Sequence, residues 1–266
     1  MKLDYEVIVV NDSSTDNSLE VASSFQDERI HIYTKENEGV SAARNYGIMH
    51  AKYDYIAFLD ADDIWESDYL ECQKKLIGTY PDAGIYSTAF YSLEKGKRKL
   101  RNVLINEHIH FLVHDYFKES VMNGLSICWT SSLCLKKEVI KEIPMFRVGI
   151  KRGEDLDLWL RIALNYDVAY LNLPKVFYRT GLSDSLTSDY SKNGEFPYYE
   201  WFNFTSESSY YRKYVILVVY IHAKNAFIHH DYDTCLAELW SVKTIAWRFK
   251  WAERLLLLVI SWIKSK

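Results

Sequence analysis

The first third of the chain alternates short apolar runs with amphipathic segments. Residues 7–10 (VIVV) and 56–59 (IAFL) are continuous apolar runs, which are typical of strands that are buried on both faces. Segments with apolar positions on one side follow each run and predict helices. The pattern predicts strands at 7–10, 30–33 and 56–59 and helices after Thr15, at 39–50 and at 65–80. Elements alternating at this spacing predict an α/β fold, with a mostly parallel sheet and helices on both faces.

The rest of the chain has a less regular pattern. Strands are expected at 84–93 and 129–135, and a basic turn (KGKRKLR) occupies 95–101. After Gly153, apolar residues at positions i, i+3, i+4, i+7 and i+8 predict an amphipathic helix. From about residue 198 onward the chain is rich in aromatic residues and is expected to be helical.

These elements predict two domains. Residues 1–195 are expected to form the α/β domain, and residues 196–266 a helical C-terminal extension. For the aromatic side chains at the start of the extension, packing in a core is favoured over stacking on a ligand. These residues are Tyr198, Tyr199, Trp201, Phe202 and Phe204.

Composition narrows the class of protein. The 266 residues carry a formal net charge of -4, so no basic field favours a nucleic-acid partner. The four cysteines show neither a CxxC pair nor zinc-ligand spacing with histidine, and a reducing, cytoplasmic setting fits them best. They are Cys72, Cys128, Cys134 and Cys235.

The C-terminal segment joins a short apolar run to tryptophan and basic residues. The run at 255–263 is too short to cross a bilayer, since a spanning helix needs about 20 apolar residues. A terminal helix packed on the core is the favoured interpretation. The alternative is an interfacial helix that places the protein at the inner face of the cell membrane, with the membrane surface as a partner.

Acidic residues directly follow the apolar run at 56–59. Ligands collect at the carboxyl ends of strands in open α/β sheets, and Mg²⁺ and Mn²⁺ prefer carboxylates together with substrate phosphates. Residues two apart on an extended segment point the same way, so Asp60 and Asp62 are expected to converge on a metal ion. The alternative is an acidic turn that caps the next helix.

Polar residues also follow the apolar run at 7–10. Asp12 can accept hydrogen bonds from a base or a ribose at this strand end. Ser14, Thr15 and Asp16 are better explained as a turn and helix cap.

The amphipathic helix after Gly153 begins with two carboxylates, Glu154 and Asp155. The helix dipole lowers the pKa of such a group, whereas a like charge beside it raises the pKa, so the net shift stays open. Arg44 and Arg179 can each bind a phosphate through two hydrogen bonds, although an exposed arginine is the simpler interpretation of either.

Four strings in this order resemble family 2 glycosyltransferases of the GT-A fold: VIVVNDSSTDNS, ENEGVSAARNYGI, YIAFLDADDIW and GEDLDLWLRIA. They span about residues 5 to 165, with a weaker echo at FYRTGLSDSLT. The resemblance implies a nucleotide-sugar donor, Mn²⁺ or Mg²⁺ as cofactor and, for members that act on sugars, inversion at the anomeric carbon. A glycan or lipid-linked acceptor of a bacterial surface polysaccharide is the usual partner in this family.

The resemblance also implies a role for each matched residue. Asp12 would contact the base, usually uracil, and Arg44 would lie near the base or the diphosphate. Asp60 would contact the ribose or the metal, and Asp62, the last residue of the DxD motif, would coordinate the metal. Asp155 would be the general base, with Glu154 helping to place the acceptor. Arg179 matches the echo and is expected on the donor side.

Two features depart from the family pattern. Members normally begin with a strand, a Pro-Thr-Tyr-Asn-like loop and a helix ahead of the segment that matches residues 5–12, and the chain is expected to lack these. Some relatives also carry a histidine metal ligand where Thr180 and Gly181 stand here, so the third ligand is unassigned.

The leading hypothesis is therefore a metal-dependent, inverting glycosyltransferase that uses a UDP-sugar or similar donor. A sugar nucleotidyltransferase shares the α/β plan and the acidic site but needs a Gly-rich loop, which is not visible here. A truncated, non-catalytic nucleotide-sugar-binding module is the third possibility.

Overall fold

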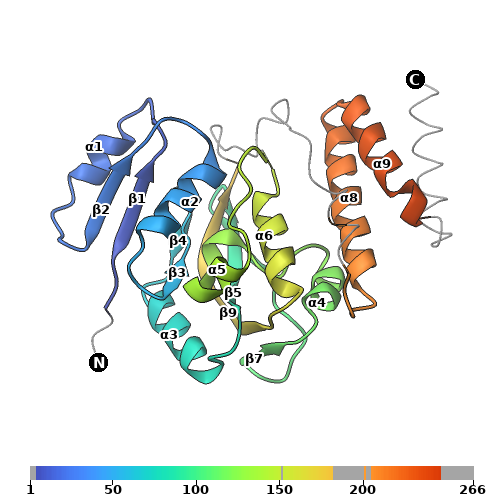
Figure 1. The fold of residues 1–266 in the computed structure, drawn as a ribbon, viewed down its shortest axis with the longest axis horizontal. Coiled ribbons are helices and arrows are strands. Elements are labelled where there is room, and N and C mark those ends of the chain that lie inside the picture. Colours follow the sequence, from blue (N-terminus) through green and yellow to red (C-terminus); the bar gives the residue numbers. More distant parts are fainter. Residues whose placement is uncertain (1–3, 151, 182–200, 202–204, 247–266) are drawn as a thin grey trace. The chain divides into compact units, whose positions relative to one another are not determined.

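The computed structural model describes residues 4–150, 152–181, 201 and 205–246 (Figure 1). The chain divides into two compact units. The first comprises Met1–Tyr116, Ile127–Leu182 and Gly194–Phe196, and the second comprises Phe117–Ser126, Ser183–Asn193 and Pro197–Lys266. The expected domain boundary at residue 195 lies outside the described residues.

The first unit alternates strands and helices, as the sequence pattern predicts. Its elements in chain order are β1 (Val7–Asn11), α1 (Ser18–Ser23), β2 (Ile30–Thr34), α2 (Val40–His50), β3 (Tyr55–Ala57), β4 (Ile64–Trp65), α3 (Tyr69–Thr79), β5 (Ile85–Glu94), β6 (Lys97–Arg101), β7 (His110–Val113), the 3₁₀ helix η1 (Thr130–Ser132), β8 (Leu133–Lys136), α5 (Lys137–Glu142), α6 (Glu154–Ala163) and β9 (Val168–Thr180).

The described strands form two sheets. β1 and β2 pair in parallel, and the larger sheet has the order β3-β8-β5-β9-β4, with β6 added to β5 and β7 added to β9. The α/β class is confirmed, but the expectation of a mostly parallel sheet is wrong. Only β1 with β2 and β5 with β9 are parallel among the described pairs. Of the antiparallel pairs, only β5 with β6 is joined by a short turn, and the others bring together strands that lie far apart along the chain.

Helices cover both faces of the larger sheet. Tyr86, Cys134 and Ala169 lie beside one another in register, and Leu76 of α3 packs against them. The neighbouring row, formed by Ile85, Leu135 and Val168, is fully buried and points to the opposite face. Helices α5 and α6 lie over that face (Figure 1).

The layer formed by β1, α1 and β2 is less buried than its sequence predicts. Val7 is 40% exposed, and the next three residues of β1 are only partly buried. α2 covers one side of β1, where Gly47 lies against Ile8 and Val10. α1 contributes no buried residue, and β1 pairs only with β2 among the described strands. The expectation that this strand is buried on both faces is therefore wrong.

The segment expected as one strand at 129–135 divides in two. Residues Thr130–Ser132 form η1, and only Leu133–Lys136 is a strand. The cause is local, because the backbone N–H of Trp129 donates to Ser132 Oγ at 3.2 Å and that hydroxyl donates back to the Trp129 carbonyl at 2.9 Å. The tight turn aims Thr130 and Ser131 at the candidate site described below.

The second unit is helical where it is described, as expected for the C-terminal part. α8 (Tyr211–Ile228) and α9 (Tyr232–Ala246) pack through a small apolar cluster, and α4 (Tyr116–Asn123) contributes Phe117, whose ring meets Tyr211 edge-on at 4.8 Å. Trp201 is fully buried, which agrees with a role in core packing. The other four aromatic residues at 198–204 and the segment 247–266 lie outside the described residues. No described helix has the length and apolar character to cross a bilayer.

Candidate active site

The acidic segment after β3 is a closed turn. β3 ends at Ala57, and the backbone N–H of Asp63 donates to the carbonyl of Asp60 at 2.9 Å. The expectation that Asp60 and Asp62 stand on an extended segment is therefore wrong, and their convergence on a metal ion stays a prediction. The backbone N–H of Asp60 donates to Ser131 Oγ at 3.0 Å, which holds the chain in the turn instead of in a strand pair.

The two carboxylates of the DxD motif lie in different environments. Asp60 Oδ1 accepts a hydrogen bond from Arg44 Nη2 at 2.8 Å. The Asp62 carboxylate makes no hydrogen bond or ion pair with any residue in the described part of the chain, while its backbone carbonyl accepts one from Arg179 Nε. Asp62 thus has a fixed backbone and a carboxylate that is available to a ligand.

Asp63 ties the turn to the end of β9. Its Oδ1 accepts a hydrogen bond from the backbone N–H of Arg179 at 3.1 Å. Burial, together with the charges of Asp60 and Asp62, raises the pKa of Asp63 to about 6. Through these contacts Arg179 lies directly beside the DxD motif, and its role on the donor side stays a prediction.

Arg44 of α2 joins the acidic turn to the start of α6. Its Nη2 donates to Asp60 as described, and its Nη1 donates to Glu154 Oε1 at 2.7 Å. The guanidinium also lies over the Phe146 ring, 5.3 Å from the centroid. Burial opposes its charge, but the two carboxylates outweigh burial and raise the pKa of Arg44, so it remains a cation. Contact of Arg44 with a nucleotide stays a prediction.

Glu154 begins α6 directly after a glycine in the left-handed region. Gly153 has a φ of +73°, a conformation that an L side chain rarely adopts. Burial first, and then the charge of Asp155, raise the pKa of Glu154 to about 7, although Arg44 acts in the opposite direction. The balance that sequence left open therefore falls on the side of a raised pKa.

Asp155 is held by two donors. Its Oδ2 accepts a hydrogen bond from Thr130 Oγ1 at 3.1 Å, and its Oδ1 accepts one from the backbone N–H of Leu156 at 2.7 Å. Burial raises the pKa of Asp155, against the opposing effects of Arg44 and these two hydrogen bonds. A half-buried, fixed carboxylate with a raised pKa is a stronger base than an exposed one.

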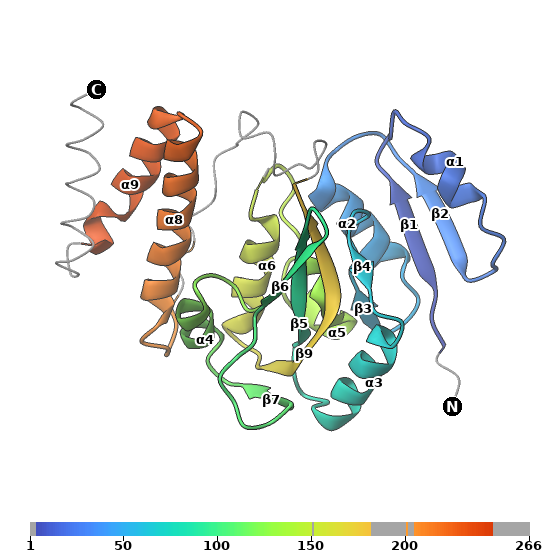
Figure 2. The same cartoon turned by 180° about the vertical axis from the view of Figure 1, so that it is seen from behind.

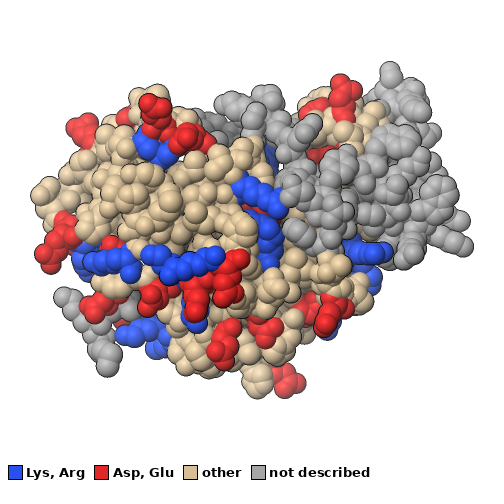
Figure 3. Space-filling model, in the orientation of Figure 1, with Lys and Arg blue, Asp and Glu red and all other residues tan. Residues whose placement is uncertain are grey.

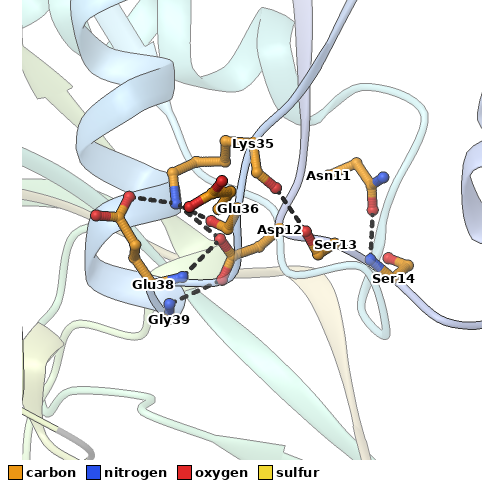
Figure 4. Close-up of polar contacts among 8 residues, drawn as sticks. All are labelled: Asn11, Asp12, Ser13, Ser14, Lys35, Glu36, Glu38 and Gly39. Carbon is orange, nitrogen blue, oxygen red and sulfur yellow. Dashed lines mark hydrogen bonds and ion pairs between the residues drawn. The ribbon is translucent and has the colours of Figure 1, made fainter.

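Asp12 anchors the loop that leads into α2 (Figure 4). Its Oδ1 accepts hydrogen bonds from Lys35 Nζ at 2.9 Å and from the backbone N–H of Glu38 at 3.2 Å, and its Oδ2 accepts one from Gly39 at 2.8 Å. Burial opposes the charge, but these donors outweigh burial and lower the pKa of Asp12. Its contact with a base stays a prediction.

The polar residues around Asp12 form the turn that sequence favours for them. Asn11 Oδ1 accepts a hydrogen bond from the backbone N–H of Ser14 at 3.0 Å (Figure 4). Asp16 Oδ1 accepts one from Ser18, the first residue of α1, also at 3.0 Å. These contacts explain the serine and acidic residues after β1 without a ligand.

The donor set at the turn fits a hard divalent cation. Mg²⁺ and Mn²⁺ are commonly bound by one or two carboxylates and completed by substrate phosphates and water. Asp62 supplies an unengaged carboxylate, and Asp60 lies two residues away. No group of three or more acidic, histidine or cysteine side chains with metal-site geometry occurs among the residues that the structure describes. Asp60 and Asp62 therefore suit a metal ion whose remaining ligands would come from a bound diphosphate and water.

The fold brings three of the four expected motifs together. Arg44 connects Asp60 and Glu154, which come from segments far apart in the sequence. Asp12 acts on this group indirectly, because it holds the loop that leads into α2, the helix that carries Arg44.

Sequence reasoning missed several residues that shape the site. Lys35 follows β2 directly, so its place at a strand end was a signal that went unused. Thr130 and Ser131 belong to a polar run next to an apolar strand, and their place in a turn could not be foreseen. Asp63 is not distinguished in the sequence from the rest of the acidic run at 60–63.

Comparisons with known proteins show the family of the chain. Residues 1–143, more than half of the chain, match the model of the family described as "Glycosyl transferase family 2". The chain is 30% identical over 169 residues to the "Putative teichuronic acid biosynthesis glycosyltransferase TuaG" of Bacillus subtilis, covering 62% of this chain and 63% of that protein. It is 31% identical over 184 residues to "Glycosyltransferase GlyA" of Streptococcus pneumoniae, covering 65% of this chain and 26% of that protein.

Each of these matches covers only part of the relative. An "Uncharacterized glycosyltransferase" of Rickettsia felis is 34% identical over 164 residues, which are 60% of this chain and 25% of that protein. The chain thus spans between a quarter and just under two thirds of the length of these three relatives.

Among solved structures, the chain resembles S. aureus TarS 1-349 in complex with UDP-GlcNAc. The two have a TM-score of 0.69 and 16% sequence identity, and the match covers 88% of this chain and 70% of that one. At this identity the likeness establishes the fold, which is the GT-A fold.

Proposed function

Because the chain belongs to glycosyl transferase family 2, we propose that it transfers a sugar from a nucleotide-sugar donor to a glycan or lipid-linked acceptor. The observation that carries the proposal is the Arg44 bridge. One largely buried guanidinium, with 13% of its side chain exposed, holds the DxD carboxylate Asp60 and the α6 carboxylate Glu154, so the expected donor and acceptor motifs form one connected site.

The donor is a UDP-sugar in this proposal. The S. aureus protein of the same fold has been solved with UDP-GlcNAc and with UDP. Asp12 and Arg44 are assigned to the nucleotide, Asp60 to the ribose or the metal, and Arg179 to the donor side. Support for the last comes from its contacts with the Asp62–Asp63 segment.

Asp62 and Asp60 are the residues that would hold Mn²⁺ or Mg²⁺. Such an ion, when bound, neutralises the negative charge that develops on a departing diphosphate. The support lies in the unengaged Asp62 carboxylate, whose backbone is fixed through its carbonyl by Arg179.

Asp155 is the proposed general base. The acceptor hydroxyl attacks the anomeric carbon and gives its proton to the Asp155 carboxylate. The bond between that carbon and the diphosphate oxygen breaks, and the nucleoside diphosphate leaves with the electron pair. Attack from the face opposite the leaving group inverts the configuration. Glu154, held by Arg44, helps to place the acceptor.

Release of UDP from a panel of UDP-sugars tests the proposal. We expect at least one donor to be turned over, and Asp155→Asn to lower the rate about 10²- to 10⁴-fold, the range typical of a lost general base. The asparagine oxygen can still accept the hydrogen bond of the Leu156 backbone N–H, and its NH2 group can donate to Thr130 Oγ1, whose role as donor is then reversed, so folding is preserved. Asp82→Asn, which changes an exposed carboxylate without a hydrogen bond to described residues, is the matched control.

Three results would contradict the proposal. Pyrophosphate release from a nucleoside triphosphate would identify a nucleotidyltransferase, and UDP binding without turnover would identify a binding module. Equal rates for Asp155→Asn and Asp82→Asn would remove the assigned base.

A further inference from the structure

β5 and β6 form a hairpin whose tip is strongly basic. Lys95 and Gly96 form its two-residue loop, with φ values of +48° and +77°, as the tightest hairpin turns require. All seven residues from 95 to 101, here called the basic hairpin, are exposed. Five of them are cations and none is acidic, and none of the five forms an ion pair with a described residue. The cations are Lys95, Lys97, Arg98, Lys99 and Arg101.

The cations of β6 form a row on one face of the sheet. Side chains alternate along a strand, so Lys97, Lys99 and Arg101 share a face at intervals of about 7 Å. Arg101 Nε donates to Ser92 Oγ at 3.1 Å, which agrees with this assignment. Arg98 points the other way and lies over the Phe177 ring, 4.8 Å from the centroid.

The basic hairpin continues from the end of β5, where β5 pairs with β9 beside the candidate site. In the register of β5 with β9, Leu93 faces Arg179 and Glu94 faces Thr180. Arg179 is the residue whose backbone N–H donates to Asp63 in the acidic turn. One residue pair, Glu94 with Thr180, therefore separates the basic hairpin from Arg179, which contacts the DxD segment. Figure 2 shows β6 beside β5.

The same face also leads toward the proposed base. Ser92, which receives the Arg101 hydrogen bond, is in register with Tyr178. The Tyr178 ring lies 4.3 Å from the Trp129 ring, centroid to centroid. The next residue, Thr130, donates its hydroxyl hydrogen bond to Asp155. A chain of contacts thus runs from the row of cations to the general base.

An alternative explanation of the basic hairpin is that charges on an edge strand prevent pairing with the edge strand of another molecule, but positive and negative charges would do this equally well. The whole chain carries 36 acidic and 32 basic residues, so five cations without an acid in seven residues depart from its composition. On the face shown in Figure 3, by contrast, acidic and basic side chains are interspersed. Protection of the edge alone does not explain the single sign or the position beside the site.

We propose that the basic hairpin binds the acceptor, and that the acceptor is a linear polymer with regularly spaced anionic groups, phosphates or carboxylates. The inference rests on the proposed function. A row of cations at about 7 Å intervals matches a chain of repeated charges better than it matches a single anion.

Binding of defined polymers to the full chain tests the inference. The probes are polyphosphate, polygalacturonate and neutral dextran of similar length, with phosphatidylglycerol vesicles as a separate arm. The hairpin variant is Lys97→Gln/Lys99→Gln/Arg101→Gln. The matched control, Lys74→Gln/Lys75→Gln/Lys141→Gln, removes as many exposed cations elsewhere. The variant Lys97→Arg/Lys99→Arg keeps the charge of the row.

We expect the wild-type chain to bind one of the two polyanions and not dextran. The hairpin variant should bind it about tenfold or more weakly, with a smaller salt dependence, since fewer counterions are released. The control variant and the arginine variant should bind within about twofold of wild type. Preference for polyphosphate or for polygalacturonate then identifies the anion.

Undiminished polyanion binding by the hairpin variant would overturn the inference, as would its absence from the wild-type chain. Loss of vesicle binding without any polyanion binding would also overturn it and would make the hairpin a membrane contact. UDP-sugar turnover, measured on the same samples, separates the two claims. A chain that binds polyanion through the hairpin but turns over no donor refutes the proposed function and not the binding surface.

Discussion

At the scale of single residues, the site depends on one largely buried cation, Arg44, between two carboxylates. Arg44 pairs with Asp60 and stabilises the charged form of Glu154, yet burial still raises the pKa of Glu154 to about 7. A buried charge that loses its partner is costly, so these three side chains are expected to act as a unit. Glu154 changes its charge near neutral pH, where the proposed reaction needs the acceptor to be correctly held.

The pH dependence of the free energy of unfolding tests the raised pKa of Glu154 directly. The folded protein binds the Glu154 proton more tightly than the unfolded chain, whose pKa is near 4.5, so unfolding becomes easier as the pH rises from about 4.5 to about 7. In the wild-type protein this effect lowers the free energy of unfolding by at most about 3 kcal/mol between pH 5 and pH 8, and Glu154→Gln should abolish that decrease. Urea unfolding at both pH values measures it, and Glu71→Gln, on the exposed side of α3, is the control. Parallel pH profiles for wild type and Glu154→Gln would refute the shift.

At the scale of elements, strongly patterned segments were predictable and contact-dependent ones were not. The apolar spacing after Gly153 predicts α6, and the same periodicity locates α2 and α3. The turn at Thr130–Ser132 was missed because a serine hydroxyl, which pattern analysis ignores, diverts the backbone. The antiparallel pairings were missed for a similar reason, since strand order depends on contacts between distant segments.

Substitution of two glycines by alanine tests two different effects on stability, close packing at Gly84 and helix propensity at Gly78. A Cβ on Gly84 would lie 2.5 Å from Tyr166 Cβ, at the contact between the start of β5 and the end of α6. Gly84→Ala should therefore destabilise the protein by about 1–3 kcal/mol. Gly78, in the last turn of α3, has no atom within 4 Å of its added Cβ. Gly78→Ala should stabilise by about 0.5 kcal/mol.

Urea denaturation of both variants measures the two changes at one pH. Equal effects of the two substitutions would mean that the contact of Gly84 with Tyr166 does not constrain the fold.

At the scale of the whole molecule, the candidate site is assembled within the first unit. Its residues come from segments between Asp12 and Arg179, which explains why separate motifs in the sequence can describe one site. The family and the positions of the motifs could be predicted from those strings. The Arg44 bridge could not, because no local pattern records which distant carboxylates an arginine will meet. The role expected of the segment 247–266 at a membrane concerns residues outside the described part.

The most direct measurement is calorimetry of UDP binding with and without Mn²⁺, on wild type, Asp62→Ala and Asp82→Ala. Asp62 is the one DxD carboxylate without a partner among the described residues, so it should carry the metal dependence. We predict that Mn²⁺ tightens UDP binding about tenfold or more in wild type and Asp82→Ala, and that Asp62→Ala abolishes this gain. Metal-independent binding in all three proteins, or no binding in any of them, would contradict a metal-dependent nucleotide-sugar site at this turn.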